Sequence, residues 1–312
     1  MQEYTYSITI SHYNNISLLK RMLKSIPERD DIQIIVVDDY STFENKEKLK
    51  SVYHKNLEIY YQPSNQGAAN ARNEGVKYAT GKWLLAVDCD DMFVEGAFDI
   101  LDHYKDEDVD YLSYCISCRN AETLEAGTRI EKANSSVLAY IQKPCKKNLK
   151  AYKFNNTDTW NKMVSLRFIH ANKIHWEENC RVNVDVLYSY LIALKAKTSM
   201  IIPDVIYWFV GAPNSITRKE RTIAREFQFY LAAQKRNGLF EKLGFGYPYY
   251  RHDLLYVVFM LQKRGFKGMI DFFKYKHQHN KEVKEARMKF KYLLNDYNPE
   301  AVLSLENNRI VG

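Results

Sequence analysis

The sequence predicts an α/β protein with a mostly parallel sheet flanked by helices and a helical extension toward the C-terminus. Short β-type runs alternate with helical patterns in the first hundred residues, which is typical of a parallel sheet with right-handed crossovers. Several of these runs end abruptly in polar side chains. From residue 220 onward, glycines and prolines separate segments with helical periodicity.

The first two strand–helix pairs occupy the first 54 residues. Residues 6–11 form a β-branched run, and residues 32–37 have the continuous apolar character of a buried parallel strand. A helical pattern follows each run, over residues 16–26 and 44–54. Because the carboxyl ends of parallel strands meet at one edge of a sheet, the polar residues after each run are expected to face a common ligand site.

The acidic segment after a later strand is the most informative feature of the chain. The apolar residues 84–87 are followed directly by Asp88, Cys89, Asp90 and Asp91. Unpaired carboxylates are too costly to bury within a sheet, so this cluster must lie at the end of the strand. Carboxylates two positions apart in a turn can hold one hard divalent cation, which commonly also binds substrate phosphates. The alternative to a metal site is an acidic turn exposed to solvent, which is the usual interpretation of two aspartates in an isolated Asp-x-Asp segment.

A loop of small residues precedes this acidic strand. Residues 65–75 (NQGAANARNEG) combine glycines and alanines, which let a backbone approach a ligand closely. Arg72 within it supplies a planar fork suited to phosphate oxygens. We expect this loop to open at the same sheet edge as the strand ends.

Together these motifs resemble family 2 of the glycosyltransferases, which are inverting enzymes with the GT-A fold, a Rossmann-like sheet flanked by helices. The shared segments stand in the family's order and spacing: YN at 13–14, VDDYS at 37–41, NQG at 65–67, ARNEG at 71–75, ATGK at 79–82 and VDCDD at 87–91. The resemblance implies a GT-A domain over residues 1–218. Residues 1–110 would bind the nucleotide sugar and residues 111–218 the acceptor, with a helical basic region over 219–312.

The resemblance implies donor-binding roles for five residues. Tyr13 is similar to the aromatic residue that lies against the nucleotide base, and Asp39 to the carboxylate that reads the uracil edge. Asn65 belongs to the nucleotide-sugar-binding set. Arg72 matches the arginine that faces the sugar and diphosphate, and Asp88 is similar to the residue that bonds the ribose or sugar.

The same resemblance implies a metal site. Asp90 is similar to the residue that coordinates the divalent cation, expected to be Mn²⁺ or Mg²⁺, with Asp91 beside it. Trp160 lies in a Trp-Asn-Lys segment that lines the sugar pocket in the family and is counted with the nucleotide-sugar-binding residues. His12 stands where the family commonly has a proline, which leaves the shape of the base pocket open.

The catalytic base is expected in the second half of the chain. An inverting transfer needs a general base on the acceptor side, and the family usually supplies it from a Glu-Asp pair that opens a helix. Asp185 falls on the base position, while Val184 replaces the usual glutamate. The alternative is that Asp185 only stabilises a helix N-terminus, in which case Glu177 or Glu178 takes its place.

A lid is expected near the end of this domain. Residues 204–209 followed by Ser215–Arg218 resemble the family's closing strand and the loop that folds over the diphosphate. Such a lid would exclude water, which otherwise hydrolyses the donor. For Arg218 an exposed loop cation is the alternative.

Charge is distributed unevenly along the chain. Residues 1–110 carry 12 Lys and Arg against 20 Asp and Glu, whereas residues 218–312 carry 19 against 10. Aromatic and basic side chains interleave over residues 263–276, so this region is expected to contact an anionic membrane surface or to act as a packing or oligomerisation element. No run approaches the ~18 apolar residues of a spanning helix, and without a recognised nucleic-acid-binding motif a nucleic-acid partner is not expected.

Cysteine usage points to a reducing compartment. The five cysteines are odd in number and no signal peptide is visible, which is typical of reduced thiols in a cytoplasmic protein. We also expect peripheral contact with the inner face of the cell membrane. Cys115 and Cys118 lack a second pair with suitable spacing, so a structural zinc site is not favoured.

These observations predict a metal-dependent, inverting glycosyltransferase. It would move a sugar from a UDP-sugar to a glycan or lipid-linked glycan acceptor in bacterial capsule, lipopolysaccharide or other surface polysaccharide synthesis. A nucleotidyltransferase is less favoured, because residues 11–15 are not a glycine-rich triphosphate loop. A catalytically inactive GT-A protein that binds glycans or acts as a scaffold is favoured only by Val184.

Overall fold

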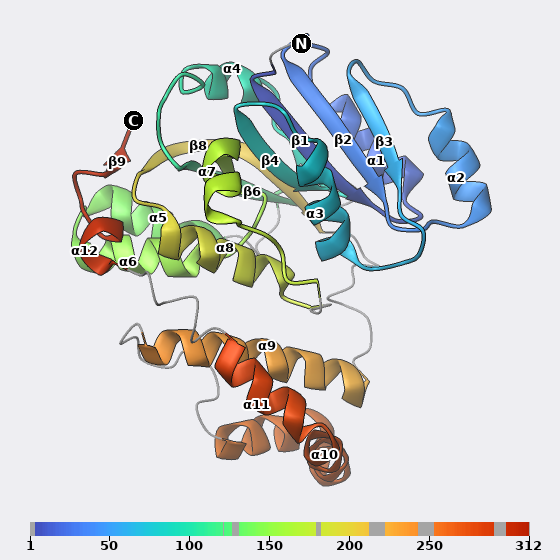
Figure 1. The fold of residues 1–312 in the computed structure, drawn as a ribbon, viewed down its shortest axis with the longest axis vertical. Coiled ribbons are helices and arrows are strands. Elements are labelled where there is room, and N and C mark those ends of the chain that lie inside the picture. Colours follow the sequence, from blue (N-terminus) through green and yellow to red (C-terminus); the bar gives the residue numbers. More distant parts are fainter. Residues whose placement is uncertain are drawn as a thin grey trace. The chain divides into compact units, whose positions relative to one another are not determined.

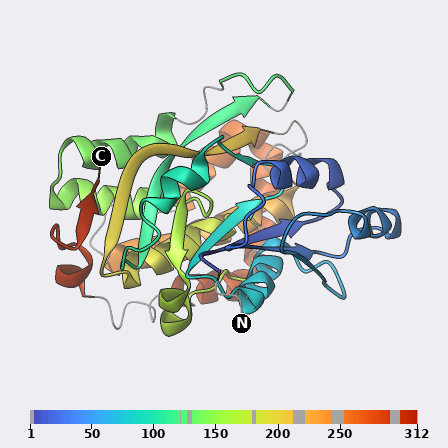
Figure 2. The same ribbon diagram turned by 90° about the horizontal axis from the view of Figure 1, so that it is seen from above.

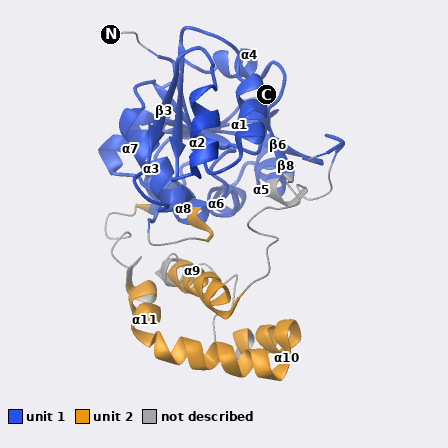
Figure 3. Cartoon of the chain, turned by 90° about the vertical axis from the view of Figure 1, so that its right-hand side faces the viewer, with its two compact units in different colours: residues 1–178, 185–215, 299–312 blue, residues 179–184, 216–298 orange. Residues whose placement is uncertain are grey.

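The computed structural model describes residues 4–120, 122–126, 131–178, 182–211, 222–242, 253–289 and 298–311. Two compact units divide the chain (Figure 3). The first comprises residues 1–178, 185–215 and 299–312, and the second comprises residues 179–184 and 216–298. The described part of the first unit contains the sheet, and that of the second is mainly helical.

A single mixed sheet forms the centre of the first unit (Figure 1). Within the described residues it has nine strands in the order β3-β2-β1-β4-β7-β6-β8-β5, and β9 pairs with β8. The strands are β1 (Tyr6–His12), β2 (Ile32–Asp38), β3 (Leu57–Tyr61), β4 (Trp83–Asp88), β5 (Met92–Phe93), β6 (Tyr111–Asn120), β7 (Lys162–Ser165), β8 (Ser199–Gly211) and β9 (Asn308–Ile310).

The parallel half of the sheet is built by three crossovers, through α1 (Ile16–Lys24), α2 (Phe43–Lys50) and α3 (Ala68–Tyr78). The first two step outward from β1 to β2 and β3, and the third returns to β4 on the other side of β1. Crossovers of one hand that run in opposite directions place their helices on opposite faces. Figure 2 shows α3 on the face opposite α1. The α/β fold class is therefore confirmed.

The inner strands of this half, β1, β2 and β4, are buried on both faces, as the apolar runs predict. All seven residues of β2 and six of the seven in β1 are buried, which is typical of parallel strands covered by helices. The helices end earlier than the sequence predicts. α1 stops at Lys24, shortly before Pro27, which lacks the backbone N–H that a helix needs.

Two glycines let the chain pass closely around β1. A Cβ atom on Gly81 would lie 2.7 Å from the backbone nitrogen of Ser7, so only glycine fits where the chain enters β4. Gly67 has a φ of 94° and caps the N-terminus of α3, a conformation that residues with a side chain rarely adopt.

The second half of the sheet is built mainly from residues 111–211. β7 lies antiparallel between β4 and β6, and β6 pairs in parallel with β8. The helices of this half are α4 (Ala97–Asp102), α5 (Glu131–Gln142), α6 (Lys146–Asn155), α7 (Leu166–Asn172) and α8 (Val184–Lys195).

The end of the chain returns to this sheet. α12 (Pro299–Val302) leads into β9, which pairs in parallel with β8. The sequence predicts a helical region over 219–312, whereas residues 308–310 form a strand. Three residues are too few to show the alternation by which a strand is recognised.

The second unit contains α9 (Ile223–Lys242), α10 (Asp253–Gln278) and α11 (Asn280–Lys289). α10 is kinked at Gly265, which has a φ of 67°. Aromatic and aliphatic side chains form its own core: Phe227, Tyr230, Leu231, Tyr256, Met260, Phe272, Val283 and Ala286. None of the described helices has the length and apolar character needed to cross a lipid bilayer.

Candidate functional site

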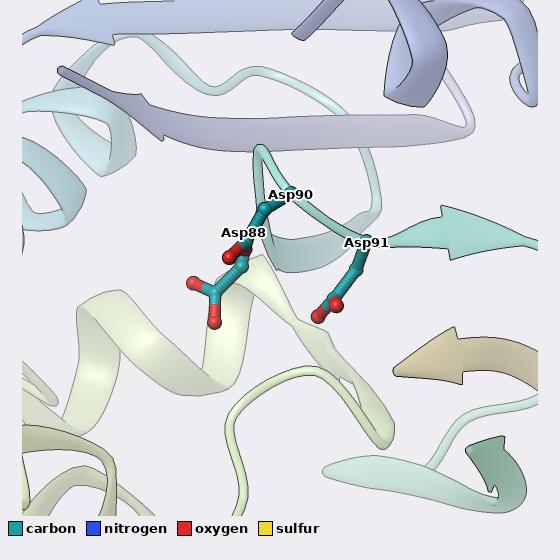
Figure 4. A group of neighbouring side chains, drawn as sticks. All are labelled: Asp88, Asp90 and Asp91. Carbon is teal, nitrogen blue, oxygen red and sulfur yellow. The ribbon is translucent and has the colours of Figure 1, made fainter. Parts of the chain in front are cut away.

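The acidic turn lies at the carboxyl end of β4, where the sequence places it. Asp88 closes the strand, and Asp90 and Asp91 follow in the turn before β5. One carboxylate oxygen from each of the three residues lies within 4.8 Å of the others. Figure 4 shows the three side chains leaving the turn on the same side. Oxygen ligands gathered in this way suit a hard cation such as Mn²⁺ or Mg²⁺.

Asp90 is held in an electrostatically unfavourable place for a lone carboxylate. Burial and the neighbouring charge of Asp88 raise the pKa of Asp90 to about 6. The Arg21 guanidinium donates a hydrogen bond to the main-chain oxygen of Asp90 and so fixes the turn. A divalent cation would relieve the repulsion between these carboxylates.

Asp91 is bound differently, because it ties the turn to β8. Its side chain is buried, with Oδ1 accepting a hydrogen bond from the Val210 N–H at 2.7 Å and Oδ2 one from the Tyr207 hydroxyl at 3.0 Å. The Tyr207 oxygen in turn accepts a hydrogen bond from the Asp88 N–H at 3.2 Å. Asp91 therefore holds the turn against β8, and each of its oxygens still has a lone pair with which it could bind a cation.

Arg72 connects this turn to the predicted base. It is 4% exposed on α3, and its Nη1 donates to Oδ1 of Asp185 at 2.8 Å while its Nη2 donates to Oδ1 of Asp88. Burial lowers the pKa of Arg72, but the charges of Asp185 and Asp88 outweigh it and raise the pKa above its ordinary value. In this structure the arginine thus bridges the end of β4 and the start of α8.

Asp185 stands in the first turn of α8 with its side chain 30% exposed. Its Oδ1 accepts hydrogen bonds from Arg72 and from the Thr159 hydroxyl at 2.9 Å. The fold therefore brings Asp185 near Asp88 from a distant part of the sequence. Of the two substitutes, Glu178 accepts a hydrogen bond from the Asn73 amide at 3.0 Å.

The predicted base-binding residues gather at the ends of β1 and β2. Tyr13 is 48% exposed. The carboxylate of Asp39 accepts hydrogen bonds from the N–H groups of Gln66 and Gly67 at 2.7 and 2.9 Å, and the Asn65 amide donates to the main-chain oxygen of Asp39. Asp39 and Asn65 thus lie together and hold residues 65–67 against the end of β2. The rest of the predicted loop is helical, because residues 68–75 belong to α3.

Asp38 organises the same region, although the motif comparison assigned it no role. His12 is buried, and its Nδ1 lies 2.8 Å from Oδ1 of Asp38, while its Nε2 accepts the Asn15 N–H at 3.2 Å. Since Nε2 accepts, Nδ1 carries the proton of a neutral ring and donates it to Asp38. The Ser41 N–H also donates to Asp38. His12 is the residue that stands where the family commonly has a proline, so the sequence marked this position but not its partner.

Trp160 lies in the hydrophobic core, where it is 7% exposed. Its ring stacks on Tyr207 and Phe209 with centroid separations of 5.5 Å each. The aromatic ring therefore packs beside the tyrosine that binds Asp91, and its contact with a sugar stays a prediction. The predicted lid residues Ser215–Arg218 lie outside the described residues.

A sequence model of the family described as Glycosyl transferase family 2 matches residues 7–173, more than half of the chain. The chain belongs to glycosyl transferase family 2. The matched part of this family 2 chain includes the acidic turn, Arg72 and Thr159, whereas Asp185 lies beyond it.

Several curated glycosyltransferases resemble parts of the chain. The minor teichoic acid biosynthesis protein GgaB of Bacillus subtilis (strain 168) is 26% identical over 208 residues, which are 64% of this chain and 22% of that protein. The GalNAc(5)-diNAcBac-PP-undecaprenol beta-1,3-glucosyltransferase of Campylobacter jejuni is 31% identical over 100 residues, 30% of this chain and 32% of that protein. The chain thus matches only about a fifth to a third of these relatives' lengths.

Solved structures share the fold. The crystal structure of S. aureus TarS residues 1–349 in complex with UDP-GlcNAc superposes with a TM-score of 0.54 at 18% identity, covering 73% of this chain and 65% of that chain. Similarity at this identity reflects the fold, which is the GT-A fold predicted from the motifs.

Proposed function

We propose that this family 2 chain is a metal-dependent, inverting glycosyltransferase that moves a sugar from a UDP-sugar to a glycan or lipid-linked glycan acceptor. The observation that carries the proposal is the joining of the acidic turn to Asp185 through Arg72 at one edge of the sheet. The names of the relatives, which refer to teichoic acid biosynthesis and an undecaprenol-linked glycan, support a role in synthesis of a bacterial surface polysaccharide.

Donor binding is assigned to the ends of β1, β2 and β4. Tyr13 would lie against the uracil base and Asp39 beside it. Arg72, held between Asp88 and Asp185, would face the sugar and diphosphate. Asp90, together with Asp88 and Asp91, would hold a divalent cation, Mn²⁺ or Mg²⁺, which neutralises charge on the departing diphosphate. The raised pKa of Asp90 supports this assignment, because such a cluster is stabilised when a cation replaces a proton.

Acceptor activation is assigned to Asp185. Its Oδ2 would take the proton of the acceptor hydroxyl while the hydroxyl oxygen attacks the anomeric carbon and the bond to UDP breaks. Attack from the face opposite the leaving group inverts the anomeric centre. The 30% exposure of the Asp185 side chain supports this role, since an acceptor must reach it.

The second unit is proposed to contact an anionic membrane surface at the cytoplasmic face. Lys267 and Lys274 lie two turns apart on one stripe of α10, with Ile270 between them, and Phe266 beside them is 69% exposed. A cavity of about 560 Å³ opens next to Lys274 and is lined by Val257, Met269, Ile270, Phe273, Lys274, His277 and Gln278. Exposed aromatic and cationic side chains in this arrangement suit the interface of an anionic leaflet.

Three other cations of this stretch have partners within the second unit. Lys263 and Arg264 lie 2.8 and 3.8 Å from a carboxylate oxygen of the fully buried Glu226. Lys276 lies over the Tyr230 ring at 5.2 Å. These three contribute to the packing of the unit, so the membrane proposal rests on Phe266, Lys267 and Lys274.

The direct test is release of UDP from a panel of UDP-sugars in the presence of Mn²⁺, with water or added glycan as acceptor. The proposal expects at least one donor to be turned over, with activity lost in excess EDTA and restored by Mn²⁺ or Mg²⁺. Failure of every donor would contradict the UDP-sugar assignment. Full turnover in EDTA would contradict the metal assignment alone.

A further inference from the structure

We propose that Thr159 and Trp176 are positioning residues that orient Asp185 for proton transfer. This inference rests on the proposed role of Asp185 as the general base. It concerns two buried residues, of which Thr159 is 1% exposed and Trp176 is fully buried. Among the described residues neither is hydrogen-bonded to the acidic turn, so their action would pass through Asp185.

The direction of the two hydrogen bonds follows from the chemistry of the groups. The Thr159 hydroxyl lies 2.9 Å from Oδ1 of Asp185 and 3.4 Å from Nε1 of Trp176. An indole nitrogen can only donate, and an ionised carboxylate can only accept. Hence the Thr159 oxygen accepts from Trp176, and its own proton is directed to Asp185.

Trp176 is itself rigidly held. Its ring stacks on Tyr188 with centroids 3.7 Å apart and planes 5° apart, and Tyr188 is three residues after Asp185 on the same face of α8. Its main chain is clamped by Asn73, whose side chain accepts the Trp176 N–H at 2.8 Å and donates to the Trp176 carbonyl at 2.9 Å. The indole therefore presents its N–H to Thr159 in a fixed direction.

The result is that the two oxygens of Asp185 have different surroundings. Oδ1 accepts from both Thr159 and Arg72, whereas no donor from the described residues is hydrogen-bonded to Oδ2. With Oδ1 held at two points, the torsion of the carboxylate is restrained and Oδ2 is left for the acceptor. A restrained base needs no reorganisation when the acceptor arrives.

The proton balance of the step is simple. The acceptor O–H proton moves to Oδ2 of Asp185, the acceptor oxygen forms its bond to the anomeric carbon, and UDP departs with the electron pair of the broken bond. Thr159 keeps its own proton throughout. It is therefore not a catalytic residue but one that sets the direction of Asp185.

Thr159→Val tests this role because it removes the hydroxyl and keeps the shape. Thr159→Ser restores the hydroxyl, and Trp176→Phe keeps an aromatic ring but removes the N–H that directs it. Thr9→Val is a matched control, since the Thr9 hydroxyl is equally buried yet has no hydrogen-bond partner among the described residues. The readouts are kcat and the donor KM for UDP release from the UDP-sugar of the panel that reacts fastest.

We expect kcat of Thr159→Val to fall by about 10- to 100-fold, because that is the effect of losing a hydrogen bond to a charged group. The donor KM should stay within about twofold, because uniform binding is untouched. Thr159→Ser should recover most of the rate, Trp176→Phe should lose part of it, and Thr9→Val should match the parent protein. Thermal unfolding of each variant establishes that it is folded.

Two outcomes overturn the inference while leaving the proposed function intact. One is a Thr159→Val variant with parent-like kcat in a protein that Asp185→Asn inactivates. The other is a Thr159→Ser variant as slow as Thr159→Val. Parent-like turnover in Asp185→Asn instead removes the base assignment, and with it the inference.

Discussion

The carboxylates of the site share one edge of the sheet but differ in their partners. Asp91 is bound through both oxygens to β8, and Asp88 is paired with Arg72. The pKa of Asp90, by contrast, is raised by burial and by its acidic neighbour. Asp185 lies on the far side of the Arg72 bridge and is partly open to solvent. These differences lead to separate predictions for Asp90 and Asp185.

Asp90→Ala is expected to abolish metal-dependent turnover without unfolding the protein. Removing this carboxylate would take a ligand from the proposed cation and would also relieve charge repulsion within the turn, so thermal stability should not fall. Titration with Mn²⁺ against UDP release measures the effect. Asp108→Ala, at an exposed carboxylate paired with Arg167, is the matched control and should keep full activity. Normal turnover by Asp90→Ala would mean that other groups hold the cation.

Asp185→Asn is expected to lower kcat by roughly 10²–10⁴-fold, because the amide keeps the shape of the carboxylate but is not a base. Binding of UDP, measured by calorimetry, should change little. Glu178→Gln serves as the comparison, since Glu178 is held by Asn73. If Asp185→Asn keeps most of its turnover and Glu178→Gln does not, the base is Glu178.

At the level of elements, α6 and β7 bury two lysines that the proposed reaction does not use. Burial lowers the pKa of Lys153 to about 7 and that of Lys162 to about 8. The Lys153 ammonium donates to the Ala196 carbonyl at 3.2 Å, and Lys162 donates to the Asn161 side chain at 2.7 Å. Lys162 also donates to the Asp158 carbonyl and lies 3.4 Å from the Ser189 hydroxyl, whereas Lys153 has only the Ala196 carbonyl as a hydrogen-bond partner among the described residues. The lost hydration of the Lys153 charge is therefore poorly compensated, and the fold is stabilised when this lysine loses its proton.

The free energy of unfolding should therefore rise with pH above about 7. Between pH 7 and the ordinary pKa of 10.5, the unfolded chain binds the Lys153 proton and the folded chain does not. This lysine therefore raises the free energy of unfolding by up to about 1.4 kcal/mol for each pH unit, so the fold becomes more stable as pH rises.

Lys153→Met isolates this contribution, because an unbranched apolar side chain fills a similar volume without charge. The variant should be more stable than the parent at pH 7, and the difference should shrink toward pH 9. Urea denaturation at pH 7, 8 and 9 measures both. Lys150→Met, a change of the same kind on the same helix at a less buried lysine, is the control. A constant difference across this range would show that Lys153 stays charged in the fold.

At the scale of the whole molecule, the chain combines a glycosyltransferase sheet with a small helical unit that has its own aromatic core. The first unit carries the acidic turn, Arg72 and Asp185. Only some of the basic side chains of the C-terminal part can contact a partner. Lys263 and Arg264 neutralise the buried Glu226, while Lys267 and Lys274 are exposed.

The protein is expected to sediment with phosphatidylglycerol vesicles at low salt and to be released as salt rises. Each lysine near an anionic surface contributes about 1 kcal/mol, and this attraction is screened by salt. The triple variant Phe266→Ser, Lys267→Gln, Lys274→Gln should bind far more weakly, without losing turnover of free donor. Lys281→Gln with Lys284→Gln removes the same charge from exposed positions of α11 and should have a smaller effect. Equal binding to phosphatidylcholine vesicles would contradict an electrostatic contact.

The sequence by itself determined the parallel half of the fold and the place of the acidic turn. Continuous apolar runs, glycines and carboxylates after a strand are local signals, because period, turn chemistry and the cost of burying charge act over a few residues. They predicted β1, β2 and β4 and placed Asp88, Asp90 and Asp91 together. The family pattern, which is also a matter of order and spacing, selected Asp185 among the acidic residues of the second half.

Only the tertiary structure decided which groups meet across the chain. The bridge from Asp88 through Arg72 to Asp185, the bond from Thr159 and the pairing of His12 with Asp38 join segments far apart in sequence. The tertiary structure also decided that β9 pairs with β8 in the main sheet and that Lys263 and Arg264 form ion pairs with Glu226. Such contacts depend on strand order and on the packing of helices over the sheet, for which a single sequence carries no local signal.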